Sequence, residues 1–126
     1  MGQKLLVVDD TPGTLDALSE FLTRAGYEVL PASTFEQARK IADEQSPDLL
    51  IVDIRLGAYN GLQLVVRERL AESRRPVIVI SGFPDQQTEA EVRKYGAEFL
   101  AKPVRPRELV DLVARLLSNP PPGPKS

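Results

Sequence analysis

The chain has 126 residues, a formal net charge of -2 at pH 7, and neither cysteine nor histidine. Its length suits one globular domain, and its composition excludes disulfides, thiolate or histidine metal sites, and Ser-His-Asp catalysis. Because the sequence has no basic excess, no membrane-spanning apolar run and no signal-peptide profile, we expect a cytoplasmic protein that binds neither nucleic acid nor membrane directly.

Five short apolar runs alternate with segments of helical spacing along the chain. The runs, which predict strands, cover residues 5–8, 28–30, 49–52, 77–80 and 98–101. Three of them are continuous rather than alternating, which is typical of strands buried on both faces of a parallel sheet. The β-α alternation predicts an α/β fold, in which five helices flank a five-stranded parallel sheet through right-handed crossovers.

Each segment between the runs places apolar residues on one helical face. The faces of the first three comprise Leu15, Leu18, Phe21 and Leu22, then Phe35, Ala38, Ile41 and Ala42, then Leu62, Val65 and Val66. The last segment has the strongest stripe, formed by Leu109, Leu112, Val113, Leu116 and Leu117.

The segment from Gln87 to Tyr95 has a thin apolar face, which predicts the least firmly held helix. Its apolar residues are mainly Ala90 and Tyr95, with Val92 to one side. From Asn119 onward the chain is too rich in proline to hold a helix or a sheet ladder. We therefore expect one domain at residues 1–118, followed by a Pro-rich tail or linker stub at 119–126.

Ionisable and hydroxyl side chains follow four of the five predicted strands. In chain order, these positions and a neighbouring glycine are Asp9, Asp10, Asp53, Ser81, Gly82 and Lys102. Ligands of open parallel sheets bind beyond the carboxyl ends of the strands, so three carboxylates, one hydroxyl and one ammonium are expected to converge there. Each group alone has an ordinary explanation as a helix cap, a turn or a solvated charge, but their conjunction favours a functional site.

Electrostatic repulsion determines what such a cluster needs. Two carboxylates about 4 Å apart near a protein surface repel by roughly 4 kcal/mol at an effective dielectric constant near 20. Lys102 supplies one compensating charge, and a hard divalent ion such as Mg²⁺, which prefers oxygen ligands, would supply two more. With a cation in place, Asp53 becomes a plausible nucleophile for phosphoryl transfer.

These motifs resemble the bacterial two-component response-regulator receiver family, of the chemotaxis-regulator type. The resemblance covers roughly residues 4–118. It rests on Val8-Asp9-Asp10, on Val52-Asp53 followed by Asn60-Gly61, on Ser81-Gly82, and on Phe99-Leu100-Ala101-Lys102-Pro103. It implies a flavodoxin-like doubly wound sheet with strand order 2-1-3-4-5. It also implies a signalling switch that assists its own phosphorylation and dephosphorylation rather than a turnover enzyme.

The resemblance further implies a role for each residue of the site. Asp53 would be the phosphoacceptor. The implied metal ligands of Mg²⁺, with Mn²⁺ as an alternative, are Asp9, Asp10, Asp53 and the backbone carbonyl of Arg55. The implied phosphate-binding and switch residues are Ser81, Gly82, Lys102 and Phe99.

Two positions depart from the commonest pattern of the family. Gly57 stands where proline is frequent, which predicts a more mobile loop. Arg55 places a cation two residues after the phosphoacceptor, at a position that tunes how long the phosphoryl group survives.

The implied phosphoryl donor is a sensor histidine kinase or a histidine phosphotransfer protein. It must be another molecule, because this chain has no histidine. We expect the output face to comprise the helix at 87–95, the fifth strand and the last helix, and to act on a downstream protein or an output domain. A further expected partner is a second copy of this chain, in a phosphorylation-dependent dimer. The cognate kinase, the output, the phosphoryl lifetime and the oligomeric state are not determined by the sequence.

Two other functions lack a motif that they require. A phosphatase of the haloacid-dehalogenase type would need a D-x-D motif, which neither Asp9-Asp10-Thr11 nor Asp53-Ile54-Arg55 provides. A flavodoxin-like cofactor binder would need a hydroxyl- and glycine-rich phosphate loop where Asp9 and Asp10 stand. The alternative that stays open is a receiver-fold interaction module that is not phosphorylated in the cell.

Overall fold

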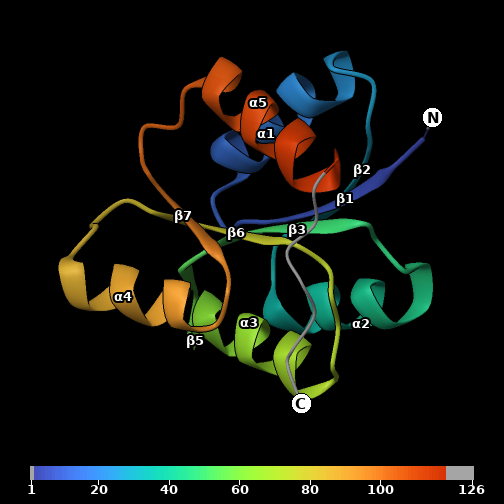
Figure 1. Cartoon of the computed structure of the whole chain (residues 1–126). Helices are drawn as coiled ribbons and strands as arrows, with labels where there is room; N and C mark the ends of the chain where they lie inside the picture. The colour runs from blue at the N-terminus through green and yellow to red at the C-terminus, as the bar shows by residue number, and fades with distance from the viewer. Residues whose placement is uncertain (1, 119–126) are drawn as a thin grey trace.

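Five parallel strands form the central sheet, in the order β2-β1-β3-β6-β7 (Figure 1). The computed structural model describes residues 2–118, so the Pro-rich tail predicted at 119–126 lies outside the described residues. The strands are β1 (Lys4–Val8), β2 (Glu28–Ala32), β3 (Leu49–Asp53), β6 (Val77–Ser81) and β7 (Glu98–Ala101). The predicted order 2-1-3-4-5 is confirmed, because β6 and β7 are the fourth and fifth strands of this sheet.

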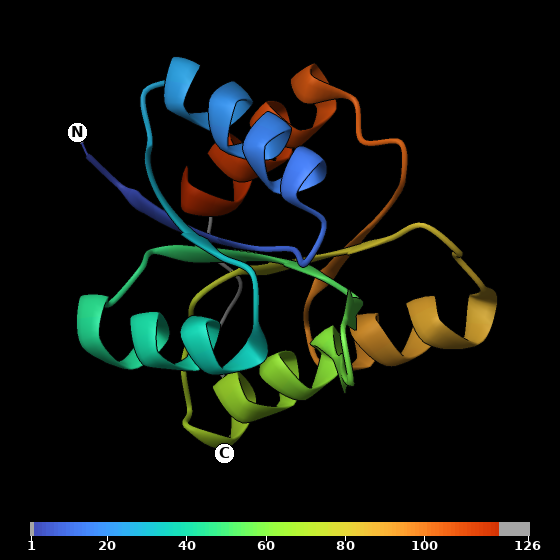
Figure 2. The same cartoon turned by 180° about the vertical axis from the view of Figure 1, so that it is seen from behind.

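Five helices cover the two faces of the sheet, as predicted. One layer contains α1 (Pro12–Arg24) and α5 (Pro106–Ser118), and the other contains α2 (Phe35–Gln45), α3 (Gly61–Leu70) and α4 (Gln86–Lys94). Figures 1 and 2 show these two layers from opposite sides. None of the helices within residues 2–118 is long and apolar enough to span a membrane.

Successive strand residues face opposite layers and so build two cores. In β1, for example, Leu5 and Val7 pack toward α1 and α5, whereas Leu6 and Val8 pack toward the other three helices. This double burial explains why the apolar runs of the inner strands are continuous.

The structure corrects the expected packing of α3 and α4 in detail. In α3 the buried apolar residues are Leu64 and Val65, whereas Leu62 is only partly buried. In α4 the buried residue is Val92 and not Ala90, which is exposed. The register of α4 is set by Val92 contacting the core cluster that contains Phe99, a tertiary contact that helical spacing alone does not reveal.

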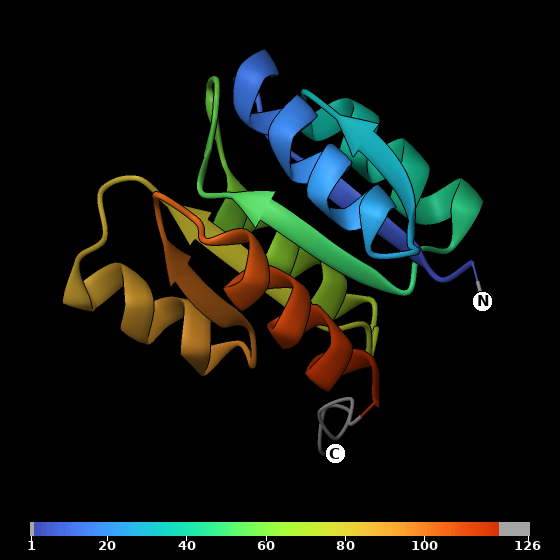
Figure 3. The same ribbon diagram turned by 90° about the horizontal axis from the view of Figure 1, so that it is seen from above.

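A short antiparallel hairpin between β3 and α3 was not predicted. It pairs β4 (Arg55–Leu56) with β5 (Tyr59–Asn60) through a turn at Gly57, whose φ of 58° is in the left-handed region that favours glycine. Figure 3 shows it projecting beyond the carboxyl end of β3, alongside the start of α1. Two-residue strands are too short to leave a periodic signal in the sequence.

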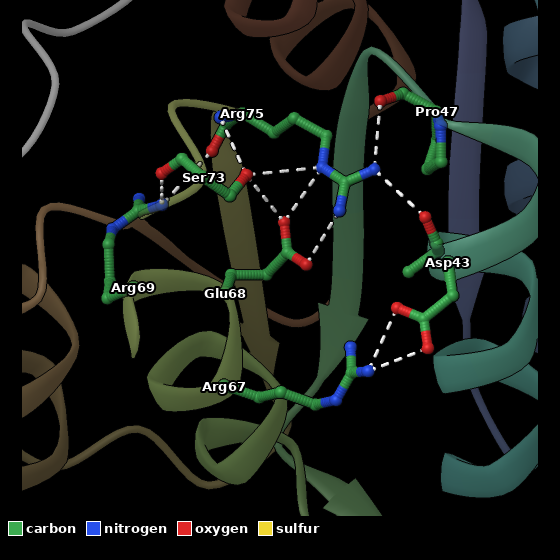
Figure 4. Close-up of polar contacts among 8 residues, drawn as sticks. Asp43, Pro47, Arg67, Glu68, Arg69, Ser73 and Arg75 are labelled. Carbon is green, nitrogen blue, oxygen red and sulfur yellow. Dashed lines mark hydrogen bonds and ion pairs between the residues drawn. The ribbon is translucent and has the colours of Figure 1, made fainter. Parts of the chain in front are cut away.

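A buried carboxylate organises the opposite edge of the sheet, at the C-terminal end of α3 (Figure 4). Glu68 is 1% exposed and forms a bidentate ion pair with Arg75, with N–O distances of 2.9 and 2.8 Å. The hydroxyl of Ser73 donates a third hydrogen bond to it at 2.9 Å. The remaining guanidinium nitrogen of Arg75 donates to the carbonyls of Ala42 and Pro47, so one side chain links α3 to the end of α2.

Arg69 extends this network toward α4. Its guanidinium donates to the carbonyls of Ser73 and Arg75 and, at 2.7 Å, to the carbonyl of Tyr95, the residue that ends α4. A weaker contact of 3.5 Å reaches the carbonyl of Gly96. Arg69 therefore fixes the C-terminal end of α4 against α3.

Gly61 allows α3 to begin directly against β3. A Cβ atom at this position would collide with the carbonyl oxygen of Asp53 and would lie 2.8 Å from a methyl group of Val52. The helix is capped there by Asn60, whose side chain accepts from the amide of Leu62. Close approach of the backbones, rather than a left-handed φ, is therefore the reason for glycine here.

Replacing Arg75 by Met would leave the Glu68 carboxylate buried without its guanidinium partner. We expect the free energy of unfolding, measured by urea denaturation, to fall by about 3–5 kcal/mol. The matched control is Arg67→Met, because Arg67 pairs with the half-exposed Asp43 at 2.8 Å and such a pair contributes only about 0–1 kcal/mol. Equal losses in the two variants would contradict this account of the buried pair.

Gly61→Ala should lower the free energy of unfolding by about 1–3 kcal/mol, because the added methyl group overpacks the junction of β3 and α3. Gly13→Ala is the control, since a Cβ there meets nothing within 4 Å and the residue lies in α1. It should stabilise the protein by about 0.5–1 kcal/mol. The two variants should therefore shift the denaturation midpoint in opposite directions. An unchanged free energy of unfolding in Gly61→Ala would show that the junction of β3 and α3 relaxes freely.

Candidate functional site

The carboxyl edge of the sheet brings together the charged residues that the sequence predicts there. The ammonium of Lys102, just after β7, lies 2.6 Å from Oδ2 of Asp53 and 3.4 Å from Oδ2 of Asp9. Carboxylate oxygens of Asp9, Asp10 and Asp53 lie within 4.8 Å of one another. These groups follow β1, β3 and β7. β1 and β3 are neighbours in the sheet, and β7 pairs with β3 only through β6, so the parallel direction of the strands brings the groups to one edge.

Each carboxylate of the cluster accepts one backbone N–H. The amide of Thr11 donates to Asp9 at 2.8 Å and the amide of Arg55 donates to Asp53 at 3.0 Å, both from two residues further along the chain. The amide of Gly57 donates to Oδ2 of Asp10 at 2.9 Å, across 47 residues of sequence. The amide dipoles therefore offset part of the negative charge that the single ammonium of Lys102 does not neutralise.

Burial makes the remaining charge costly. Asp9 and Asp53 are 1% and 5% exposed, whereas Asp10 is exposed. Burial raises the pKa of the Asp9 carboxyl, the charge of Asp53 raises it further, and the Thr11 amide and Lys102 only partly oppose this rise. For Lys102, burial lowers the pKa, but the hydrogen bond and charge of Asp53 and the charge of Asp9 outweigh it and raise the pKa.

The donor set fits a hard divalent cation. Three carboxylates face one another with one ammonium among them, and each offers an oxygen to a common centre. A divalent ion would relieve the repulsion that raises the pKa of Asp9. The backbone of Arg55 adjoins the cluster through its N–H, which donates to Asp53.

The predicted phosphate-binding residues lie on the neighbouring loop. Ser81 is buried at the end of β6, and its Oγ accepts from the amide of Phe83 at 3.2 Å. Gly82 adjoins Lys102, whose Cδ would lie 3.7 Å from a Cβ added there, an ordinary contact. Phe99, on β7, is buried in the core cluster between the sheet and the layer of α2, α3 and α4.

Two contacts around the site were not predicted. The first is the bond from Gly57 to Asp10, which depends on the hairpin. The second is a cation–π contact in which the guanidinium of Arg55 lies 4.4 Å from the ring centre of Phe83, a ring that is 70% exposed. Gly57, between Arg55-Leu56 and Ala58-Tyr59, is only a weak turn signal. The pairing of Arg55 with Phe83 has no signal in the sequence because the two residues lie on separate loops.

Comparisons with known proteins show which family the chain resembles in sequence and in fold. The family model described as the response regulator receiver domain matches residues 5–114. The chain is 30% identical to the alkaline phosphatase synthesis transcriptional regulatory protein PhoP of Bacillus subtilis, covering 93% of this chain and 49% of PhoP. It is also 30% identical to the chemotaxis protein CheY of Thermotoga maritima, covering 92% of this chain and 98% of CheY.

A similar solved structure is a CheY-like receiver domain from Methanospirillum hungatei, with a TM-score of 0.88 and 25% identity over 94% of this chain and 95% of that one. The chain thus spans about half the length of some curated relatives, such as PhoP, and nearly all of others. Because the family model covers most of the chain, the protein belongs to the response regulator receiver domains of two-component signalling.

Proposed function

We propose that the chain is a phosphorylation-dependent switch in which Asp53 accepts a phosphoryl group from a phospho-histidine with the help of Mg²⁺. The observation that carries the proposal is the position of Asp53. Its carboxylate is nearly buried, is held by Lys102 at 2.6 Å and by the Arg55 amide at 3.0 Å, and lies beside two further carboxylates. Mn²⁺ would serve in place of Mg²⁺ at oxygen ligands.

In the proposed reaction an oxygen of the Asp53 carboxylate forms a bond to phosphorus. The phosphorus–nitrogen bond of the donor breaks, and its electron pair stays on the imidazole, which can then take up a proton. The donor would be a sensor kinase or a histidine phosphotransfer protein, since this chain has no histidine. A bound divalent cation would neutralise phosphoryl charge next to the carboxylates.

The other residues would act on the phosphoryl group once it is bound. Lys102, now paired with Asp53, would pair instead with a phosphoryl oxygen. The hydroxyl of Ser81 would donate a hydrogen bond to a second phosphoryl oxygen, and Gly82 would leave space for the phosphoryl group to approach. Asp9 and Asp10, with the backbone carbonyl of Arg55, would complete the cation site.

The packing of α4 supports a route from this site to an output face. Of the described residues of α4, only Val92 is buried, and it lies near the C-terminal end that Arg69 holds through the Tyr95 carbonyl. The N-terminal end follows the loop of Ser81 and the exposed Phe83. Movement of Ser81 toward the phosphoryl group would therefore displace the N-terminal end of α4 more easily than its anchored end.

The proposed output face consists of α4, β7 and α5. Phe99 lies on β7 against α4, so a shift of α4 would change the packing of this ring as an aromatic switch. The coupling should be modest, about 1–3 kcal/mol. A downstream protein, an output domain or a second copy in a phosphorylation-dependent dimer would then respond. We also propose that residues 1–118 form the receiver domain and that it acts in the cytoplasm, where its kinase partner would present the phospho-histidine.

Intact-protein mass spectrometry after incubation with Mg²⁺ and a small acyl-phosphate donor tests the chemistry. We expect wild type to gain one phosphoryl group, and we expect no gain without a divalent cation or in Asp53→Asn. Asp16→Asn, which changes an exposed carboxylate on α1, should behave as wild type. If wild type gains nothing from a phospho-histidine donor either, the interaction-module alternative would replace this proposal.

Ser81→Ala separates phosphorylation from the conformational response. The variant should still be phosphorylated on Asp53, but it should lose most of the phosphorylation-dependent change in hydrogen exchange at α4 and β7. Ser118→Ala, at an exposed hydroxyl, is the control and should keep the wild-type change. A full exchange response in Ser81→Ala would show that the hydroxyl does not transmit the signal.

A further inference from the structure

The β4–β5 hairpin is anchored at both of its strands. Leu56 on β4 is buried in the core between the sheet and the layer of α2, α3 and α4. Tyr59 on β5, although 45% exposed, stacks on Phe35 at the start of α2, with ring centres 4.9 Å apart and an angle of 16° between the planes. Aromatic pairs of this kind contribute beyond the area they bury, so the ring of Tyr59 ties the hairpin to α2.

The turn of this hairpin orients the exposed carboxylate of the site. Within the described residues, the hydrogen bonds of the Asp10 carboxylate are confined to the one from the Gly57 amide to Oδ2. Asp9 and Asp53 differ in this respect, because each is buried, accepts an amide from its own loop and lies near Lys102. The orientation of Asp10 therefore depends on an element from elsewhere in the chain.

The left-handed conformation of Gly57 makes this contact possible. Its φ of 58° closes the two-residue turn and directs its N–H at Asp10, and proline could supply neither this φ nor the donor. The second oxygen, Oδ1, accepts no hydrogen bond from residues 2–118. The amide thus fixes one oxygen of the carboxylate while the other remains available to a cation.

We propose that the β4–β5 hairpin is a positioning element for the cation site. In this role the Phe35–Tyr59 stack holds the hairpin, the hairpin places the Gly57 amide, and the amide orients Asp10. The inference rests on the proposed function in that it takes Asp10 as a cation ligand. It adds residues that touch neither the cation nor the phosphoryl group but set the affinity for the cation.

Direct Mn²⁺ binding tests the inference without any phosphorylation assay. Free Mn²⁺ is measured by electron paramagnetic resonance while each purified protein is titrated. Tyr59→Ala should raise the Kd by about tenfold, the effect typical of losing a group that orients a metal ligand. Tyr59→Phe keeps the stacked ring and should stay within about twofold of wild type, and the 80% exposed Leu70 gives a second control as Leu70→Ala.

A double-mutant cycle distinguishes positioning from general destabilisation. Phe35→Ala should raise the Kd for Mn²⁺ as much as Tyr59→Ala does. The double variant should have a Kd no higher than that of either single variant, because each single substitution already removes the same stack. In wild type, the Gly57 amide should be protected from hydrogen exchange, and Tyr59→Ala should reduce this protection even without metal. This amide measurement also tests the positioning role in a variant that is too unstable to be titrated with Mn²⁺.

The outcomes distinguish a failure of the positioning role from a failure of the proposed function. If wild type binds Mn²⁺ and Tyr59→Ala binds it with the same Kd and the same protection of Gly57, the positioning role is wrong while the proposed function stands. If wild type does not bind Mn²⁺ at all, the cation-dependent function itself is overturned.

Discussion

Mutual repulsion among Asp9, Asp10 and Asp53 is the constraint on which the rest of this structure depends. Their oxygens lie within 4.8 Å of one another, and two such charges about 4 Å apart repel by roughly 4 kcal/mol near a surface. The fold compensates them in part with Lys102 and with one backbone amide for each carboxylate. What remains uncompensated is negative charge that a divalent cation would neutralise.

The two edges of the sheet solve the same electrostatic problem in different ways. At the amino edge, the buried Glu68 is fully paired with Arg75 and Ser73, which leaves nothing for a ligand to complete. At the carboxyl edge, three carboxylates share one ammonium. Arg69 connects the closed edge to the end of α4, so this helix has one fixed end and one end that follows the loop of Ser81.

Sequence patterns predicted the five-stranded sheet and the convergence of the site residues, because these follow from buried runs and from the direction of parallel strands. The strand order was predicted only through the resemblance to the receiver family. They misplaced the buried face of α4, where Val92 and not Ala90 contacts the core, since a nine-residue helix with few apolar residues has no clear periodicity. They also missed the hairpin and its bond to Asp10. That contact joins residues 47 positions apart through a glycine conformation, and neither feature leaves a pattern in a single sequence.

Asp53 is the covalent centre of the proposed switch, and reductive trapping tests this role most directly. Borohydride reduces an aspartyl phosphate to homoserine, so treatment after phosphorylation marks the residue that carried the group. Peptide mass spectrometry should find homoserine at position 53 in the presence of Mg²⁺ and a phosphoryl donor, and aspartate there when Mg²⁺ is omitted. Homoserine at position 9 or 10 instead, or at no position, would contradict the account.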